Sequence, residues 1–250
     1  MGSMSKNHTS QIPDKIKIRI SEYGFKEELL NIITHGAGVL LSIVGLIVLC
    51  QQANSKGTYL HLVSYIIFGS TLIALYLAST LYHSFANTKF NQFFKRIDHL
   101  SIYFLIAGTY SPLMLLGIEG PVGLIMITVI WGLVVVSCIF RCSKNKILQK
   151  IAFINYLLMG WLVVVVLDKL FVNISTRSVY LLIIGGLFYT IGVIFYLWEK
   201  LPFNHSMFFN CSLTCLRTMC LKSKLVFEKI VFFNCPLIFS ILANTNRFNS

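Results

Sequence analysis

The chain has 250 residues, of which 56% are hydrophobic and only 12% are charged, and its mean hydropathy is +0.75. Soluble domains usually carry about 25% charged residues, so this composition excludes a soluble domain. It predicts instead an all-α membrane protein whose chain crosses the bilayer several times.

Polar residues dominate the N-terminal part, residues 1–25, which lacks the short basic start and apolar run of a signal peptide. We therefore expect a cytoplasmic arm there. Uncharged apolar runs follow at residues 36–53, 59–82, 100–118, 120–140, 151–167 and 178–198. Each is near the ~20 residues that cross a ~30 Å hydrocarbon layer, which predicts six spans.

A seventh span is doubtful. The segment from His205 to Leu221 has enough residues to cross, but Asn210 and Arg217 interrupt it. An Arg near the middle of a membrane costs about 2.5–3.5 kcal/mol on an insertion scale. We therefore expect this segment to insert poorly.

Basic residues predict the orientation of the spans. With a cytoplasmic N-terminus, thirteen Lys and Arg residues flank the spans on the inner side, and three, Lys56, Lys169 and Arg177, on the outer side. Membrane proteins keep positive charge on the cytoplasmic side, so the N-terminus is predicted to be cytoplasmic. The same asymmetry accounts for most of the formal net charge of +12, and we expect no nucleic-acid partner.

Three polar side chains mark one predicted membrane face. Ser79 and His83 are four residues apart, so a helix presents them on one face about one turn apart. Asp98 follows a charged connection and opens the third span. Ionisable groups at membrane depth are costly and are kept mostly where they pair, bind a cation or line a pathway. Zinc is an economical explanation, because neutral imidazole suits it and a carboxylate can orient a bound water.

The predicted topology also brings His35 and His205 to this face, whereas His61 lies at the outer end of the second span. A simpler interpretation competes with a metal site. A single His at a helix end is usually an interfacial side chain with its ring half in water, and we favour this interpretation for His35, His61 and His99.

Glu28 and Asn31 also have a simple interpretation. Both stand where the first span begins, and a Glu near a helix N-terminus is favourable by about 0.3–1 kcal/mol. They could therefore do no more than charge and cap the first turns of that helix.

Four motifs follow one another along the chain: Asn31-Ile-Ile-Thr-His35-Gly, Ser79-Thr-Leu-Tyr-His83-Ser, Ile97-Asp-His-Leu-Ser-Ile-Tyr103 with Ala107-Gly-Thr-Tyr-Ser-Pro112, and Leu201-Pro-Phe-Asn-His205-Ser. They resemble the signature segments of the bacterial hemolysin III proteins, which are similar to the progestin and adiponectin receptor family. The resemblance covers residues 26–208 and implies a seven-helix membrane domain with a zinc site near the cytoplasmic face. Carried onto this chain, it implies His83 and His205 as metal ligands, Ser79 and Asp98 as catalytic residues, and Glu28, Asn31 and His35 as further motif positions.

One position departs from the family pattern. A second His is expected four residues after His205, where this chain has Phe209. We therefore expect weakened zinc binding and treat residues 209–250 as an aberrant tail. Since the pattern is lost at a single residue, we hypothesise a reading-frame change, which resequencing around codon 209 would test.

Three functional classes stay open. The likeness of the family to membrane ceramidases implies a zinc-dependent hydrolase of a lipid amide, with Asp98 as the base. The family name implies cytolytic, pore-forming activity, and the scaffold would also suit a non-catalytic receptor or a membrane-homeostasis factor. In each case we expect membrane lipids as partners and a bacterial inner-membrane location, and the sequence leaves the oligomeric state open.

Overall fold

The computed structural model describes residues 25–118 and 120–197. Its helices are α1 (Phe25–Lys56), α2 (Tyr59–Ser84), α3 (Asn91–Gly117), α4 (Pro121–Cys142), α5 (Lys146–Trp161), the 3₁₀ helix η1 (Leu162–Val166), α6 (Leu167–Asn173) and α7 (Thr176–Leu197). Within these two ranges there is no strand, which confirms the prediction of an all-α fold.

Five helical stretches in the described part of the chain are long and apolar enough to cross a membrane. They are Glu28–Ser55, Tyr59–Ser84, Asn91–Gly117, Pro121–Cys142 and Lys146–Asn173. The sixth predicted span corresponds to α7, in which a shorter apolar stretch, Ser178–Leu187, is described. The polytopic helical bundle is thus confirmed. The doubtful seventh span lies outside the described residues, together with His205 and Phe209.

Two helices begin well before the predicted spans. The first was predicted over residues 36–53 and the third over 100–118, but α1 begins at Phe25 and α3 at Asn91. The prediction used uncharged apolar runs, which begin after His35 and His99, and therefore left Glu28 and Asp98 outside the spans. Both carboxylates lie inside helices, where they are buried between neighbouring elements rather than exposed to lipid.

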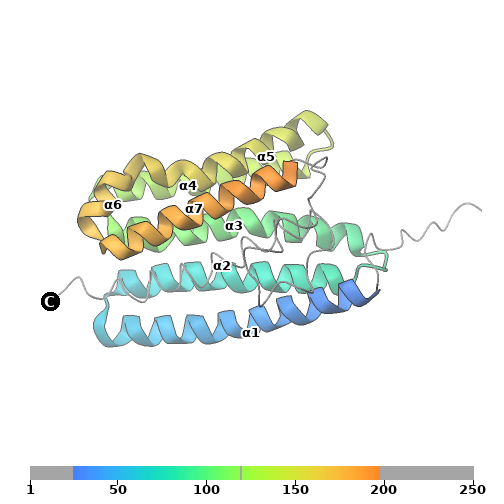
Figure 1. Cartoon of the computed structure of the whole chain (residues 1–250), viewed down its shortest axis with the longest axis horizontal. Coiled ribbons are helices and arrows are strands. Elements are labelled where there is room, and N and C mark those ends of the chain that lie inside the picture. The colour runs from blue at the N-terminus through green and yellow to red at the C-terminus, as the bar shows by residue number, and fades with distance from the viewer. Residues whose placement is uncertain (1–24, 119, 198–250) are drawn as a thin grey trace, which may run out of the picture.

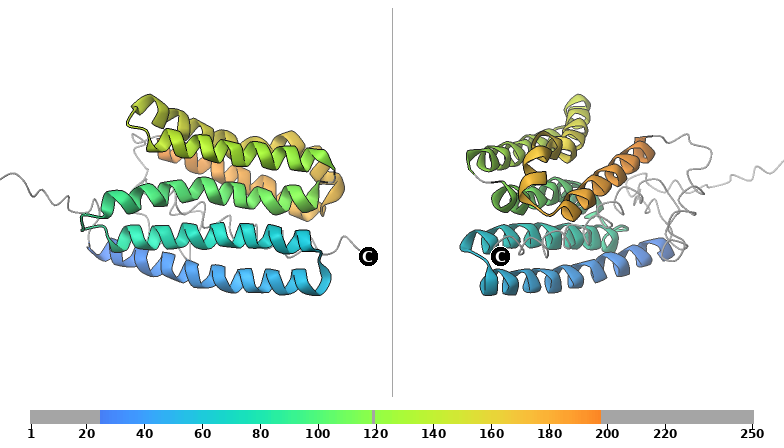
Figure 2. Two further views of the ribbon diagram at one scale, coloured as in Figure 1. Left: turned by 180° about the vertical axis from the view of Figure 1, so that it is seen from behind. Right: turned by 60° about the vertical axis from the view of Figure 1, so that its left-hand side comes forward.

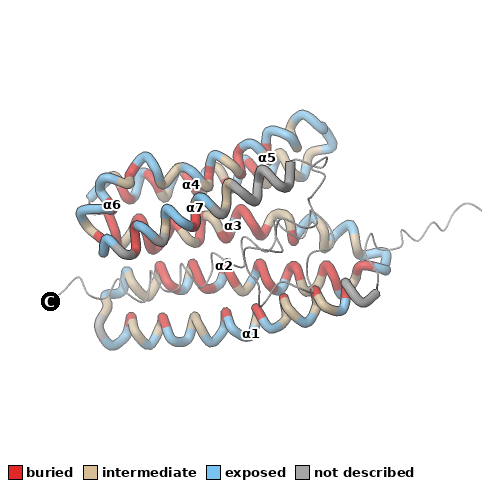
Figure 3. The backbone as a smooth tube through the Cα atoms, in the orientation of Figure 1, coloured by how far each residue is buried: buried red, intermediate tan, exposed pale blue. Residues whose placement is uncertain are grey.

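Helices α1 to α5 pair in chain order, each antiparallel to the one before it, through the contacts α1 with α2, α2 with α3, α3 with α4 and α4 with α5 (Figure 1). α3 lies between the α1–α2 pair and the helices α4 to α7, as Figure 1 and the view from behind in Figure 2 show. Buried positions line the facing sides of α1 and α2, while the outer side of α1 is exposed (Figure 3). This outer side is apolar, as a lipid-facing helix surface requires.

α2 and α3 approach each other closely at Gly108. A Cβ added there would meet the Thr71 side chain on α2 at a distance that real Cβ atoms do not reach. Small residues at such crossings let membrane helices pack by van der Waals contact, because lipid supplies no hydrophobic driving force between them. The α2–α3 crossing therefore depends on a residue without a side chain.

Hydrogen bonds in the apolar interior hold α5 in place. Tyr103 on α3 donates to the Ala152 carbonyl at 3.1 Å, and Tyr189 on α7 donates to the Tyr156 carbonyl at 2.8 Å. Asn155 on α5 donates to the Leu133 carbonyl of α4 at 3.0 Å. Such bonds are worth roughly 0.6–2 kcal/mol each between membrane helices.

The fifth predicted span is interrupted rather than straight. α5 ends at Trp161, η1 follows, and α6 completes the crossing. The hydroxyl of Tyr110 lies at this break, where it donates to the Met159 carbonyl at 2.8 Å and accepts from the Val163 N–H at 2.6 Å. It thus satisfies backbone groups that a break in a helix would leave unpaired.

Candidate metal centre

Glu28 and His83 form a buried polar pair between the first two helices. Glu28 lies in the first turns of α1 and His83 in the last turn of α2, 55 residues apart in the chain. His83 Nδ1 lies 2.7 Å from Glu28 Oε2, and the two residues expose only 3% and 6% of their surface. The interpretation of Glu28 as a simple cap and charge for the first turns does not account for this bond, which crosses to a neighbouring helix.

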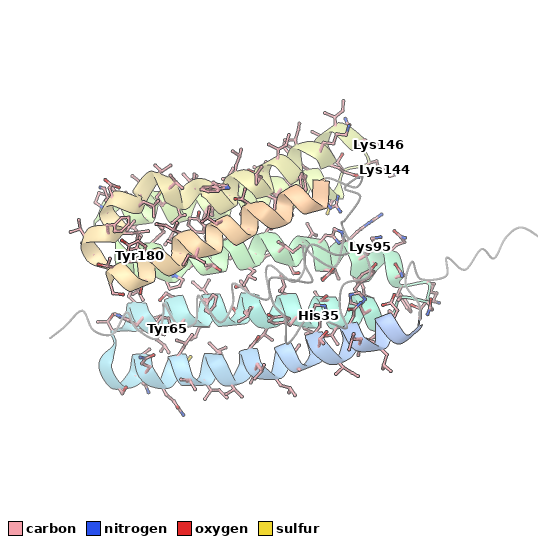
Figure 4. The ribbon with its side chains drawn as sticks, in the orientation of Figure 1. His35, Tyr65, Lys95, Lys144, Lys146 and Tyr180 are labelled. Carbon is pink, nitrogen blue, oxygen red and sulfur yellow. The ribbon has the colours of Figure 1, made fainter. Side chains whose placement is uncertain are left out.

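His35 packs against the same imidazole. Its ring lies parallel to that of His83, with ring centroids 5.6 Å apart and 2° between the planes, and Tyr76 lies beside it at 6.3 Å. His35 exposes only 8% of its surface. The prediction of a ring half in water was therefore wrong for His35, because antiparallel packing of α1 on α2 covers this turn. Figure 4 shows His35 between the two helices.

Asn31 and Ser79 complete the polar lining of the α1–α2 interface, and each exposes only 2% of its surface. Among the described residues, Asn31 Nδ2 and Ser79 Oγ have no hydrogen-bond partner. Buried polar atoms are normally satisfied, and a pair of such atoms near one site favours a bound water, ion or ligand group.

Asp98 lies two turns inside α3, at the end of the bundle where α1 begins and α2 ends. It is only 4% exposed, and its Oδ2 lies 3.9 Å from Nδ1 of His99. His99 Nδ1 also lies 2.7 Å from the Lys95 carbonyl, and its side chain is 31% exposed. The interfacial interpretation therefore holds for His99, while Asp98 is a carboxylate buried in the bundle.

His61 has a separate role at the other end of α2. Its Nδ1 accepts a hydrogen bond from the Thr58 N–H at 3.2 Å, which caps the helix N-terminus. The prediction that His61 stays apart from the other His residues agrees with this position.

A zinc ion would find a partial ligand set here. When Nδ1 of a neutral His83 donates to Glu28, Nε2 carries the lone pair, and a carboxylate that orients a His in this way is typical of zinc ligands. Within residues 25–118 and 120–197, however, no three His, Cys, Asp or Glu side chains gather as a metal site. His83 thus fits the chemistry of zinc, and the remaining predicted ligand, His205, lies outside the described residues.

The Glu28–His83 bond is the feature that sequence reasoning missed. Glu28, Asn31 and His35 follow the spacing i, i+3, i+7, which places them on one face of α1. This polar stripe on an otherwise apolar helix was the available signal. It shows which face of α1 is buried, but not which residue of α2 it meets.

These observations define a class of protein: a multi-pass α-helical integral membrane protein with a buried carboxylate and imidazole cluster at one end of its bundle. The family model described as Haemolysin-III related matches residues 23–216. The chain therefore belongs to the hemolysin III family, as the motifs predicted.

Relatives agree with this assignment. The chain is 42% identical over 182 residues to Hemolysin-3 of Bacillus cereus, covering 73% of this chain and 83% of the relative. It is 40% identical over 185 residues to the Hemolysin-3 homolog of Bacillus subtilis strain 168, covering 74% and 87% respectively. A human protein, monocyte to macrophage differentiation factor, is 27% identical over 187 residues, which cover 72% of this chain and 76% of that protein.

Proposed function

We propose that this protein is a zinc-dependent hydrolase that cleaves an amide bond of a membrane lipid. The observation that carries the proposal is the burial of three ionisable side chains, Glu28, His83 and Asp98, at one end of a membrane bundle, where each exposes 6% or less. Ionisable groups inside membrane segments are expensive and mark functional sites by default.

Each residue would have its own role in the reaction. His83 and His205 would hold the metal, and zinc, when bound, supplies activation of water and polarisation of the amide carbonyl. Asp98 would take the proton of the attacking water and return it to the nitrogen of the leaving amine. The C–N bond breaks, and an amide and a water become a carboxylic acid and an amine. Ser79 Oγ, one helical turn from His83, would donate a hydrogen bond to the carbonyl oxygen.

The location of the site suits a lipid substrate. The cluster lies near one end of the bundle, and a lipid whose chains lay along the apolar outer faces would have its polar groups near the level of that end. We place the protein in the bacterial cell (inner) membrane, which is consistent with its Bacillus relatives.

The test is hydrolysis of a fluorogenic ceramide-type amide by the purified full-length protein in detergent. We expect chelator-sensitive turnover that zinc restores, and a loss of at least about a hundredfold in Asp98→Asn, as removal of a general base predicts. Ser42→Ala is a matched control, because Ser42 is a buried hydroxyl of α1 that donates to the Gly38 carbonyl of its own helix. Turnover that survives both chelation and Asp98→Asn would exclude this function.

The name of the Bacillus cereus relative supports a second candidate, membrane-lesion activity. Leakage of a trapped dye from liposomes that contain the protein, unaffected by His83→Ala, would favour this candidate. A protein active in neither assay would favour the third class, a receptor or membrane-homeostasis factor.

A further inference from the structure

We infer that Glu28 is a positioning residue that holds His83 in the tautomer and orientation required of a metal ligand. The inference deepens the proposed function and rests on it, since it concerns the same predicted zinc site. It starts from a bond between α1 and the helix of the predicted ligand, His83 Nδ1 to Glu28 Oε2 at 2.7 Å.

The bond decides which imidazole nitrogen faces the metal. A neutral imidazole has one N–H and one lone pair. A carboxylate can only accept, so the neutral ring directs its N–H from Nδ1 to Glu28 and leaves the lone pair on Nε2. Carboxylate partners of metal-bound His residues act in this way, and their loss typically lowers metal affinity by about 10–100-fold.

Two rings fix the plane of the imidazole. His35 lies parallel to His83 on one side, and Tyr82 contacts it with ring centroids 4.8 Å apart. A flip of the ring by half a turn about the Cβ–Cγ bond would keep this plane, and the bond between Nδ1 and Glu28 selects one of the two orientations. Together the three neighbours define both the plane of the ring and the direction of Nε2.

A purely structural role is the competing explanation, because a buried hydrogen bond between α1 and α2 would also stabilise the bundle. The two roles predict different results for two variants. Glu28→Gln keeps the length of the side chain and can still hydrogen-bond His83, but its amide donates as well as accepts, so it no longer fixes the tautomer. Glu28→Asp keeps the charge but is one methylene shorter, so it cannot reach His83 in the same geometry.

The experiment measures zinc retained by the full chain in detergent after dialysis against a graded chelator. The same variants are also studied by ¹⁵N NMR in the metal-free protein with labelled His side chains. The signals of His83 are assigned as those that His83→Ala lacks. We expect Glu28→Asp and Glu28→Ala to lose zinc at about 10–100-fold lower chelator concentration. Glu28→Gln should also lose zinc more readily than the parent chain, because the carboxylate is lost, whereas a purely structural hydrogen bond would leave it close to the parent. Ser42→Ala should equal the parent chain. The spectra should show Nε2 of His83 without a proton in the parent chain, and a mixture of tautomers in Glu28→Gln and Glu28→Asp.

The outcomes separate this inference from the function on which it rests. If zinc retention and the tautomer are the same in every Glu28 variant but His83→Ala loses zinc, Glu28 is structural only and the inference is wrong. If His83→Ala retains zinc as well as the parent chain, the zinc site itself is wrong, and the inference falls with it. If Glu28→Ala does not fold, Glu28→Asp and Glu28→Gln still decide between these results.

Discussion

The ring of His35 on α1 lies parallel to the ring of His83 on α2, with centroids 5.6 Å apart and 2° between the planes. Both residues are buried, so the stack is part of the interface that holds the first helix on the bundle. Aromatic pairs of this kind contribute about 0.5–1.5 kcal/mol beyond the area they bury. The stack therefore links the stability of the α1–α2 pair to the placement of the candidate ligand.

We expect His35→Ala to lower the free energy of unfolding in detergent by about 1 kcal/mol or more, because it removes the stack and leaves a cavity. His35→Phe keeps a flat ring in the same place and should lose less. Chemical denaturation followed by fluorescence measures both variants. Equal losses would show that the ring packing contributes nothing and that another property of His35 matters.

Gly108→Ala should destabilise the α2–α3 crossing by about 1–3 kcal/mol, because the new methyl group overlaps the Thr71 side chain. The combination with Thr71→Ala, which removes the overlapping atoms, should recover much of this loss in a double-mutant cycle. Gly132→Ala on α4 is the matched control, since an added Cβ there meets no atom of the described structure within 4 Å. It should be neutral or slightly stabilising, and a similar loss at both glycines would argue against the close approach.

Tyr110→Phe should cost about 1 kcal/mol, because both hydrogen bonds of the hydroxyl at the break between α5 and η1 are lost. The N–H of Val163 should then exchange faster with deuterium than in the parent chain. Tyr180→Phe is the control, since Tyr180 is 59% exposed. Unchanged exchange at Val163 would mean that the hydroxyl does not support the break.

Reporter fusions test the orientation. Fusions after Lys89 and Lys146 should report the cytoplasm, and fusions after Lys56 and Glu119 the opposite side, because basic residues stay inside. The structure agrees in one respect: Lys95, Lys144 and Lys146 lie at the same end of the bundle (Figure 4). A periplasmic signal after Lys146 would separate the predicted ligands and contradict the site.

Phe209→His should tighten zinc binding by about a hundredfold, because one nitrogen donor in a four-ligand site is worth on the order of 3 kcal/mol. The family spacing H-x-x-x-H from His205 is then restored. Addition of His83→Ala should abolish the gain, since two ligands on one segment lack the third. Equal zinc retention in the parent chain and both variants would remove the zinc site from this protein.

The composition alone determined the class of protein. Apolar runs of membrane length can be recognised without tertiary contacts, because the bilayer sets their length and excludes charge. Motifs such as Ser79 to His83 also marked the end of the bundle where the polar residues gather. The bounds of α1 and α3 could not be found this way, because Glu28 and Asp98 are tolerated inside helices only where neighbouring helices bury them.

Tertiary structure alone decided which polar groups meet. The bond between Glu28 and His83 depends on the register of α1 against α2, and the two residues are 55 positions apart. His35 is buried because α1 packs on α2. In the same way, the hydroxyl of Tyr110 can accept from the Val163 N–H at the break after α5 only because α3 and α5 lie side by side. Helical periodicity shows which face of a helix is polar, but the partner of that face is set by how side chains of two helices fit together.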